Sequence, residues 1–223
     1  MRILCPARAS ELTLIRRLFA AFAVLATIAP STLGREKKTL TLTASQARGA
    51  DAQLDASTPT TNYGTAQSLN VAAKGSTGNA SRAIIQFDFS SLSNVGVKRA
   101  DMSLVVTAVG NKQGSYEAHR VTNIWTESAV TWTNRVAGTA WATAGGEFNA
   151  TATAAVTINA AAPGTYTWGL TTDVQNWYSG TQNFGHVILE NPSAGNDNTG
   201  ILFNSRNATS NQPQIALTFL QQV

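Results

Sequence analysis

The strongest constraint on this chain is an alternation of apolar and polar residues with a period of two, which recurs from Thr39 to Phe219. Successive side chains of a β-strand point to opposite faces, so each run predicts a strand with one buried and one solvated face. The apolar members of the clearest runs are Leu40 and Leu42; Ala52 and Leu54; Leu69, Val71 and Ala73; Ala83, Ile85, Phe87 and Phe89; Met102, Leu104, Val106 and Ala108; Val187 and Leu189; Ile201 and Phe203; and Ile215, Leu217 and Phe219. Many short strands separated by Gly- and Asn-rich turns predict an all-β fold, an antiparallel β-sandwich with a jelly-roll-like arrangement.

One segment departs from this period and predicts a short helix near residues 172–179. Val174 and Trp177 are three residues apart, and Gly180 stands where a glycine commonly ends a helix. We expect Thr171 or Thr172 to cap the helix, and Val174 and Trp177 to pack against the end of the sandwich. The Ala-, Thr- and Gly-rich stretch 137–162 is expected to form loops and one or two weak strands.

Residues 1–34 have the pattern of a secretory signal peptide. Arg16 and Arg17 precede a twelve-residue apolar segment, 18–29, which Pro30 ends. This segment is shorter than the ~20 residues that a membrane-spanning helix needs, although an uncleaved anchor stays the alternative. We therefore expect a signal peptide (1–34), a short charged tail (35–38) and a single β-sandwich domain (39–223), secreted to the extracellular space with no membrane span after cleavage.

The net charge of +4 comes mostly from the leader. Four of the sixteen basic residues and one of the twelve acidic residues lie in 1–34, which leaves 12 and 11. The weak long-range field of the remainder argues against a nucleic-acid partner. Cys5 is the one cysteine, so the predicted domain has no thiol for a disulfide, a nucleophile or a metal cluster.

Several motifs occur in a characteristic order along the predicted domain. They are Asp51–Leu54, Thr61–Gly64, Arg82–Leu92, Arg120–Thr122, Trp125–Trp132, Thr172–Trp177, Gly200–Arg206 and Gln212–Ile215. With these motifs the chain resembles the DNRLRE domain, which is grouped with carbohydrate-binding module family 96, over residues 48–220. The resemblance implies an extracellular β-sandwich that binds polysaccharide, and some relatives bind acidic ones such as alginate. The chain departs from the family pattern at Ser205-Arg206-Asn207, where Ser-Arg-Glu is usual, and in 137–165.

Five residues are the candidates for sugar binding: Arg82, Arg206, Arg120, Tyr63 and Trp141. A guanidinium group donates two parallel hydrogen bonds and so suits the carboxylates of an acidic sugar. The alternation places Arg82 and Arg206 on solvated faces, with a structural salt bridge or carbonyl clamp as the alternative for both. The face of Arg120 depends on the register of 116–121.

Aromatic rings provide the other kind of sugar contact. Trp141 lies in a loop without periodic neighbours, and Tyr63 lies at a turn between Asn62 and Gly64, so both are candidates for an exposed platform, with a packed structural position as the alternative for each. The remaining tryptophans are expected in the core, because large aromatic side chains dominate sandwich cores. They are Trp125, Trp132, Trp168 and Trp177.

Asp51 and Asp55, near the start of the sandwich, are candidate ligands for a structural calcium ion. The alternative for Asp51 is to cap a turn, because the chain has no dense Asp-x-Asp loop. No other cofactor is expected. His119 and His186 each stand alone in a strand pattern, and the sequence has no nucleophile elbow, His-Glu-x-x-His motif or Gly-rich phosphate loop. These features predict that the protein is not an enzyme.

The sequence thus predicts a secreted, non-catalytic carbohydrate-binding module, acting as a monomer on a polysaccharide, with an acidic one such as alginate as the expected ligand. Two alternatives stay open. A structural or adhesive cell-envelope subunit would suit the low-charge surface, which is rich in Thr and Asn. A polysaccharide-degrading enzyme would need a pair of carboxylates at a set separation, for which the sequence singles out none among Glu117, Glu127, Glu147 and Glu190.

Overall fold

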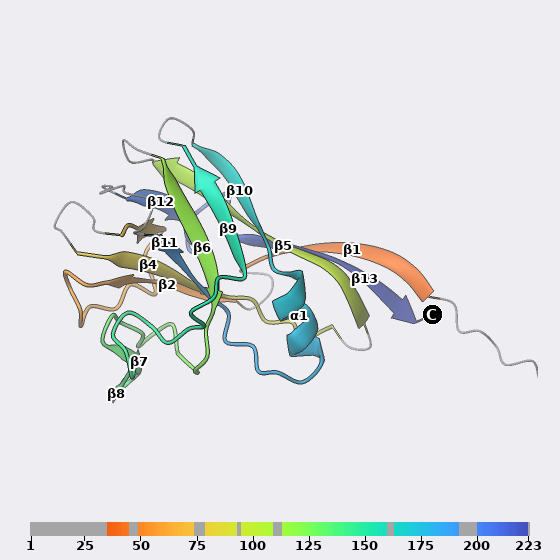
Figure 1. Ribbon diagram of the computed structural model, residues 1–223, viewed down its shortest axis with the longest axis horizontal. Coiled ribbons are helices and arrows are strands. Elements are labelled where there is room, and N and C mark those ends of the chain that lie inside the picture. Colours follow the sequence, from red (N-terminus) through yellow and green to blue (C-terminus); the bar gives the residue numbers. More distant parts are fainter. Residues whose placement is uncertain are drawn as a thin grey trace, which may run out of the picture. The chain divides into compact units, whose positions relative to one another are not determined.

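The computed structural model describes residues 35–44, 49–73, 79–92, 95–108, 113–159, 163–191 and 200–222. Within these residues two antiparallel sheets and a two-stranded ribbon form, with one helix, which confirms the expected all-β sandwich (Figure 1). The first sheet runs in the order β1 (Arg35–Thr43), β13 (Gln214–Gln222), β5 (Val95–Ala108), β12 (Ile201–Asn204) and β3 (Ser68–Val71), with β10 (Gly164–Gly169) also paired to β5. The second sheet runs in the order β2 (Ala50–Asp55), β4 (Ser81–Gln86), β11 (His186–Glu190), β6 (Gly114–Arg120) and β9 (Ala154–Ile158). The ribbon pairs β7 (Asn134–Val136) with β8 (Thr139–Ala140).

The core between the two sheets is built around three large aromatic side chains. Trp168 of β10 and Tyr116 of β6 each meet the ring of Phe203 of β12 edge to face, with ring centroids 5.9 and 6.4 Å apart. Trp168 also donates its indole N–H to the Tyr116 carbonyl oxygen at 2.9 Å. Because Tyr116 belongs to the other sheet, these contacts join the two layers. The prediction that Trp168 is a core residue is confirmed.

A second apolar cluster covers the outer face of β2, β4 and β11. Segment 121–153 lies over this face and contributes Trp125, Val130 and Trp141, which pack on residues of these strands such as Leu54 and Ile84. Trp141 is only 5% exposed and donates its indole N–H to the Thr131 carbonyl oxygen at 3.1 Å. The prediction that Trp141 is an exposed platform is therefore wrong. The segment lacks periodicity because it folds as a cover over a sheet and not as a strand within one.

Helix α1 (Thr171–Tyr178) forms where the sequence predicts it, but its cap differs. Leu170 is the N-cap residue and no side chain caps the helix. The Thr171 hydroxyl instead accepts a hydrogen bond from the Ala100 amide at 3.1 Å, and the Gln175 amide donates to the Val97 carbonyl oxygen at 2.9 Å. These bonds satisfy backbone groups of β5 that lie beyond the end of its pairing with β10. They therefore hold the helix against this edge of β5.

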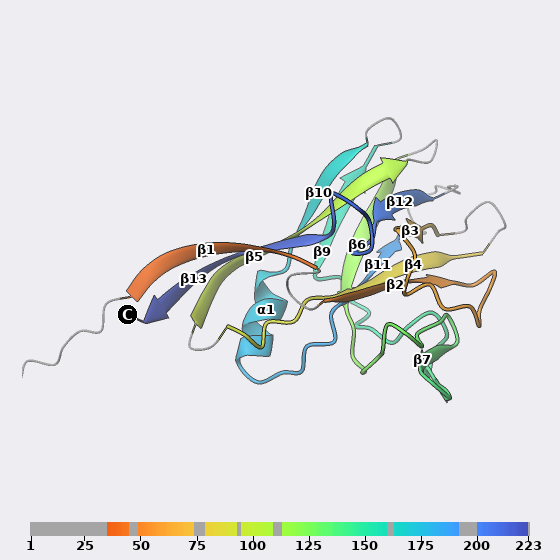
Figure 2. The same cartoon turned by 180° about the vertical axis from the view of Figure 1, so that it is seen from behind.

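The predicted charged tail, 35–38, is the beginning of β1, which pairs with β13 from Arg35↔Gln222 to Thr43↔Gln214. β13 pairs in turn with β5. Beyond α1 these three strands continue together as a narrow extension of the first sheet (Figures 1 and 2). The signal peptide expected at 1–34 lies outside the described residues and stays a prediction. Within the described residues, no helix is long and apolar enough to span a bilayer.

Candidate functional site

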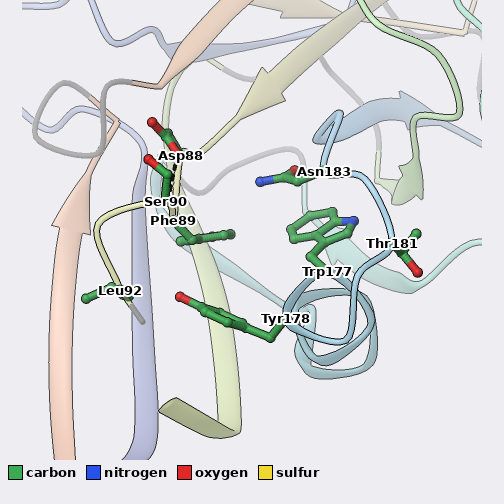
Figure 3. Close-up of a pocket in the computed structure, with 8 residues that line it drawn as sticks. All are labelled: Asp88, Phe89, Ser90, Leu92, Trp177, Tyr178, Thr181 and Asn183. Atoms are coloured by element: carbon green, nitrogen blue, oxygen red, sulfur yellow. Dashed lines mark hydrogen bonds between the residues drawn. The ribbon is translucent and has the colours of Figure 1, made fainter. Parts of the chain in front are cut away.

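A pocket of about 350 Å³ opens where the end of α1 meets the segment that follows β4 (Figure 3). Two short stretches of chain line it. They contribute Asp88, Phe89, Ser90 and Leu92 from one side, and Trp177, Tyr178, Thr181 and Asn183 from the other. Its volume lies within the range of small-molecule binding sites, about 300–1,000 Å³.

Local hydrogen bonds shape the wall that follows β4. The strand ends at Gln86, and Asp88 then accepts a hydrogen bond from the Ser90 amide at 2.8 Å, which turns the chain (Figure 3). Asn183 connects the opposite loop to this wall, because its side-chain amide donates to the Phe87 carbonyl oxygen at 2.7 Å and accepts from the Gly185 amide at 2.9 Å. Hydrogen bonds of Asn183 thus join the two sides of the pocket.

Three aromatic rings form the apolar part of the pocket. The Phe89 ring is stacked with that of Trp177 at a centroid distance of 5.9 Å and lies 6.2 Å from that of Tyr178. Trp177 and Tyr178 are half-buried. Burial, with the nearby Asp88 charge adding to it, raises the pKa of Tyr178 to about 12, so its hydroxyl stays protonated at physiological pH. An aromatic surface beside a few polar groups is the usual composition of a binding site for an organic ligand.

A buried His–Asp pair supports Trp177 from beneath. The His186 ring lies 5.2 Å from the Trp177 ring, and its Nε2 is 2.9 Å from Asp173 Oδ2. Burial lowers the pKa of His186 in spite of this carboxylate. Burial alone would raise the pKa of Asp173, but hydrogen bonds from His186 and Thr153 outweigh it and the pKa is lowered. Both lowered pKa values fit a neutral His186 that donates its Nε2–H to an ionised Asp173. His186, expected to be a tolerated strand residue, thus helps position Trp177.

Arg120 is the one predicted sugar-binding residue that lies near this pocket. It borders a smaller recess of about 150 Å³, which includes Thr181 of the aromatic pocket together with Gln182 and Phe184. The Arg120 side chain is 24% exposed, and its Nε lies 3.8 Å from Asp173 Oδ1. The register places Arg120 opposite His186, which settles the face that the sequence left open.

Arg82 has a structural role instead of the exposed one predicted for it. Its guanidinium lies between the rings of Trp132 and Phe148, 4.9 and 5.2 Å from their centroids, and donates to the Gly145 carbonyl oxygen at 2.6 Å. Burial lowers the pKa of Arg82. Segment 121–153 covers this face, so a side chain that alternation assigns to solvent is half-buried. The carbonyl clamp, the alternative reading of the sequence, is the one observed. Trp132, expected in the core, is half-buried.

Arg206 is also half-buried and not on a solvated face, because it pairs with both carboxylate oxygens of Glu127. Its backbone N–H donates to Asp51 Oδ2 at 2.6 Å, and the Asp51 N–H donates to Glu127 Oε1 at 2.9 Å. The hydrogen bonds and charge of Glu127 raise the pKa of Arg206. Burial raises the pKa of Asp51 to about 7; the Arg206 amide opposes this and the Glu127 charge adds to it. The cluster of Asp51, Glu127 and Arg206 therefore joins three segments of the fold.

Tyr63 and Asp55 make local contacts. The Tyr63 hydroxyl lies 2.8 Å from the Thr58 hydroxyl, and the Tyr63 side chain is half-buried. Asp55 accepts hydrogen bonds from the Ser57 amide at 2.8 Å and from Gln53 at 2.9 Å. In the part of the chain that the structure describes, no group of three or more His, Cys, Asp or Glu side chains is arranged to hold a metal ion. Asp51 and Asp55 thus each accept hydrogen bonds from donors of the protein itself.

Sequence reasoning missed the aromatic pocket, because it assigned Trp177 to the core and passed over Phe89 and Tyr178 as binding residues. One signal was present. Trp177 and Tyr178 are adjacent in an eight-residue helix, where neighbouring positions diverge by about 100° around the axis. Both side chains pack against the main core and stay half-buried, so a pair of adjacent aromatic residues at the end of so short a helix was a signal of an aromatic surface.

A β-sandwich with a preformed aromatic pocket is a common framework for binding a saccharide. The model of carbohydrate-binding module family 96 matches residues 42–219, and the chain belongs to this family. It is thus a carbohydrate-binding module, as the sequence motifs predict. No curated protein matches the chain.

Proposed function

We propose that this protein acts outside the cell as a non-catalytic polysaccharide-binding module and that the aromatic pocket holds the sugar. The observation that carries the proposal is the pair of half-buried rings, Trp177 and Tyr178, beside Phe89 in one pocket. Such rings contact the apolar C–H face of a sugar ring, and the carboxylate of Asp88 at the same pocket can accept hydrogen bonds from its hydroxyls. Because the walls are already joined through Asn183, little order has to be gained on binding.

The expected ligand is an acidic polysaccharide such as alginate. Arg120 supports this assignment, because its recess adjoins the aromatic pocket at Thr181. One sugar ring on Trp177 and Tyr178 would bring the carboxylate of a neighbouring sugar toward Arg120. Arg82 and Arg206, which are engaged by Gly145 and Glu127, are no longer part of the proposed ligand contact.

The composition of the pocket supports a non-catalytic role. Glycoside hydrolysis commonly uses two carboxyl groups about 5–9.5 Å apart. Among the described residues that line the pocket, Asp88 is the single carboxylate. Release of new reducing or unsaturated ends from a bound polysaccharide would contradict this part of the proposal and favour the enzyme.

Three further expectations belong to the same proposal. Export through residues 1–34 is tested by finding the mature protein outside the cell with a cleaved N-terminus. Monomeric behaviour is tested by the mass in solution, since a large assembly at micromolar concentration would favour the envelope subunit. A structural calcium ion at Asp51 or at Asp55 is tested by the effect of a chelator on the unfolding temperature.

The central experiment measures binding to neutral and acidic polysaccharides by affinity electrophoresis, with Trp177→Ala compared with Trp132→Ala. Both tryptophans are half-buried, but Trp132 lies against Arg82 and away from the pocket lining. Loss of an aromatic anchor typically costs about 2 kcal/mol of binding free energy, or roughly 30-fold in affinity. We expect this loss for Trp177→Ala alone. Equal binding by the two folded variants would overturn the assignment of the pocket.

A further inference from the structure

Positive charge is distributed very unevenly over the described residues. We define the basic ribbon as residues 35–38 of β1, 95–101 of β5 and 219–222 of β13, which form most of the narrow extension of the first sheet (Figures 1 and 2). Five of the nine described Arg and Lys residues lie on it, with two acidic residues. The other described residues include four basic and eight acidic side chains. The ribbon is therefore a cationic region among described residues that are otherwise acidic on balance, and its basic residues are Arg35, Lys37, Lys38, Lys98 and Arg99.

The cations outside the ribbon are occupied by the fold. Arg82 donates to the Gly145 carbonyl oxygen, Arg206 pairs with Glu127, and Arg135 donates to the Ile124 carbonyl oxygen at 3.3 Å. Arg120 faces Asp173, although its side chain reaches the recess described above. Each of these four cations therefore already has a partner within the fold.

The cations of the ribbon are exposed and only partly neutralised. Lys38 lies 3.7 Å from Glu36, and Arg99 pairs with Asp101. Arg35, Lys37 and Lys98 form no ion pair with any described residue, and all three are exposed.

Strand geometry sets the spacing of these charges. Arg35 and Lys37 are two residues apart on β1, so they share a face at a separation of about 7 Å. Thr39, two residues further on, aligns through Thr218 with Arg99 of β5, two strands or about 10 Å away. Arg35 and Lys37 are thus within one Debye length, about 8 Å at physiological ionic strength, and their potentials add. Lys37 is offset from Arg99 by about 7 Å along the strands and about 10 Å across them, or roughly 12 Å in all, so Arg99 adds a partly screened contribution.

We propose that the basic ribbon is a second ligand-binding surface, which holds a linear, carboxylate-bearing polysaccharide by electrostatic attraction. The proposal rests on the proposed function in that the ligand of the protein is a polysaccharide, but it assigns a different site. Adjacent residues of a strand point to opposite faces, so Lys38 lies on the face opposite Arg35 and Lys37. A narrow ribbon with cations on both faces suits a flexible polyanion that bends around it.

Other polyanions fit the ribbon less well. A protein that lies on an anionic bilayer presents apolar side chains on the same face as its cations. The one large hydrophobic side chain that is strongly exposed in the described residues is Ile124, which lies outside the ribbon. Proteins that bind single-stranded nucleic acids stack the bases on aromatic rings, whereas Phe219, the aromatic residue of the ribbon, is buried.

Two contact surfaces on one polymer would cooperate. Once the pocket holds one sugar, the same chain is present near the ribbon at a high effective concentration, and the two contacts add in affinity. The two surfaces should differ in their response to salt, because the stacking contact is largely independent of ionic strength and the ribbon contact is screened.

The test compares the double variant Lys37→Gln/Lys98→Gln with Lys74→Gln/Lys112→Gln, which removes the same charge from the chain between β3 and β4 and between β5 and β6. The probes are polygalacturonate, its neutral methyl ester, dextran, and vesicles in which roughly 30% of the lipid is anionic, to imitate an anionic membrane leaflet.

For polygalacturonate at low ionic strength we expect Lys37→Gln/Lys98→Gln to bind about tenfold more weakly, or ~1.4 kcal/mol. We expect the control variant to bind as the wild type does, and the difference to vanish at about 1 M salt, where the Debye length is ~3 Å.

The outcomes separate the two sites. If the ribbon variant binds polygalacturonate as tightly as the control while Trp177→Ala does not bind, the ribbon proposal is overturned and the pocket stands. If the ribbon variant loses binding and Trp177→Ala keeps it, the ribbon stands and the pocket assignment fails. Preferential binding of the wild type to the vesicles would overturn the assignment of a polysaccharide to the ribbon. Unchanged unfolding temperatures of both double variants would exclude misfolding as the cause.

Discussion

The aromatic pocket and the covered face of the second sheet use the same residue types for different purposes. Both combine tryptophan, phenylalanine and polar groups beside β4 and β11. On the covered face, segment 121–153 buries Trp125 and Trp141 and encloses Arg82 between two rings. At the pocket, Trp177 and Tyr178 lie at the end of a helix that nothing described covers completely, and both stay half-buried. An aromatic residue therefore stabilises the fold or is available to a ligand according to what lies over it, and not according to its type.

The sharpest test of this comparison replaces one tryptophan from each of the two regions by alanine. Trp141→Ala should lower the free energy of unfolding by about 3–5 kcal/mol, because it leaves a large cavity in the second cluster. Trp177→Ala should cost less stability and should remove sugar binding. Chemical denaturation and affinity electrophoresis on both variants measure this. A Trp141→Ala protein that is as stable as the wild type would break the comparison.

The pH dependence of stability should reveal the cluster of Asp51, Glu127 and Arg206. The pKa of Asp51 is about 7 in the folded protein and near the ordinary 3.8 in the unfolded chain, so the folded state binds the extra proton between these values. Stability from this group is fully present below about pH 4 and is lost as the pH rises through 7, with an upper limit of about 4 kcal/mol. Asp51→Asn should remove this dependence of the unfolding free energy on pH. The wild type should therefore lose stability relative to the variant between pH 5 and pH 8. Parallel curves for the two proteins would show that Asp51 titrates normally.

Arg82 and Arg120 also differ in whether the fold encloses them, and the expected difference between their variants is smaller. Arg82→Gln should destabilise the fold by about 2 kcal/mol, since it leaves the Gly145 carbonyl oxygen without its donor and removes two cation–π contacts. Its effect on binding per folded molecule should be small. Arg120→Gln should weaken binding to an acidic polysaccharide by about threefold at low salt, which is the size of an exposed ion pair. Equal binding losses for the two variants, measured at matched folded concentration, would contradict the separation of their roles.

The smallest expected effect is that of the Tyr178 hydroxyl. In the described residues this buried oxygen makes no hydrogen bond, so Tyr178→Phe should leave the unfolding free energy within about 0.5 kcal/mol of the wild type or raise it slightly. The ring that we propose to contact the sugar is retained, so binding should change by less than threefold. Thermal unfolding and the same binding assay measure both quantities. A marked loss of stability would indicate that the hydroxyl has a partner in solution.

Several elements could be predicted from the sequence because their cause is local. Period-two alternation determines which strands form, as for Leu69 and Val71 in β3 and for Ile215 and Leu217 in β13. The spacing of Val174 and Trp177 and the following Gly180 locate α1 to within one residue. The order of the motifs identifies the family over the whole domain.

The sequence by itself determined the all-β fold, its helix and its family, because strand alternation, helix spacing and motif order are properties of residues close together in the chain. Only the tertiary structure decided that Trp141 is buried, that Arg82 is enclosed and that Trp177 and Tyr178 border a pocket. Each of these outcomes depends on which segment from elsewhere in the chain lies over a side chain. A segment such as 121–153, whose contacts are long-range and whose pattern has no period, leaves no local signal of where it will pack.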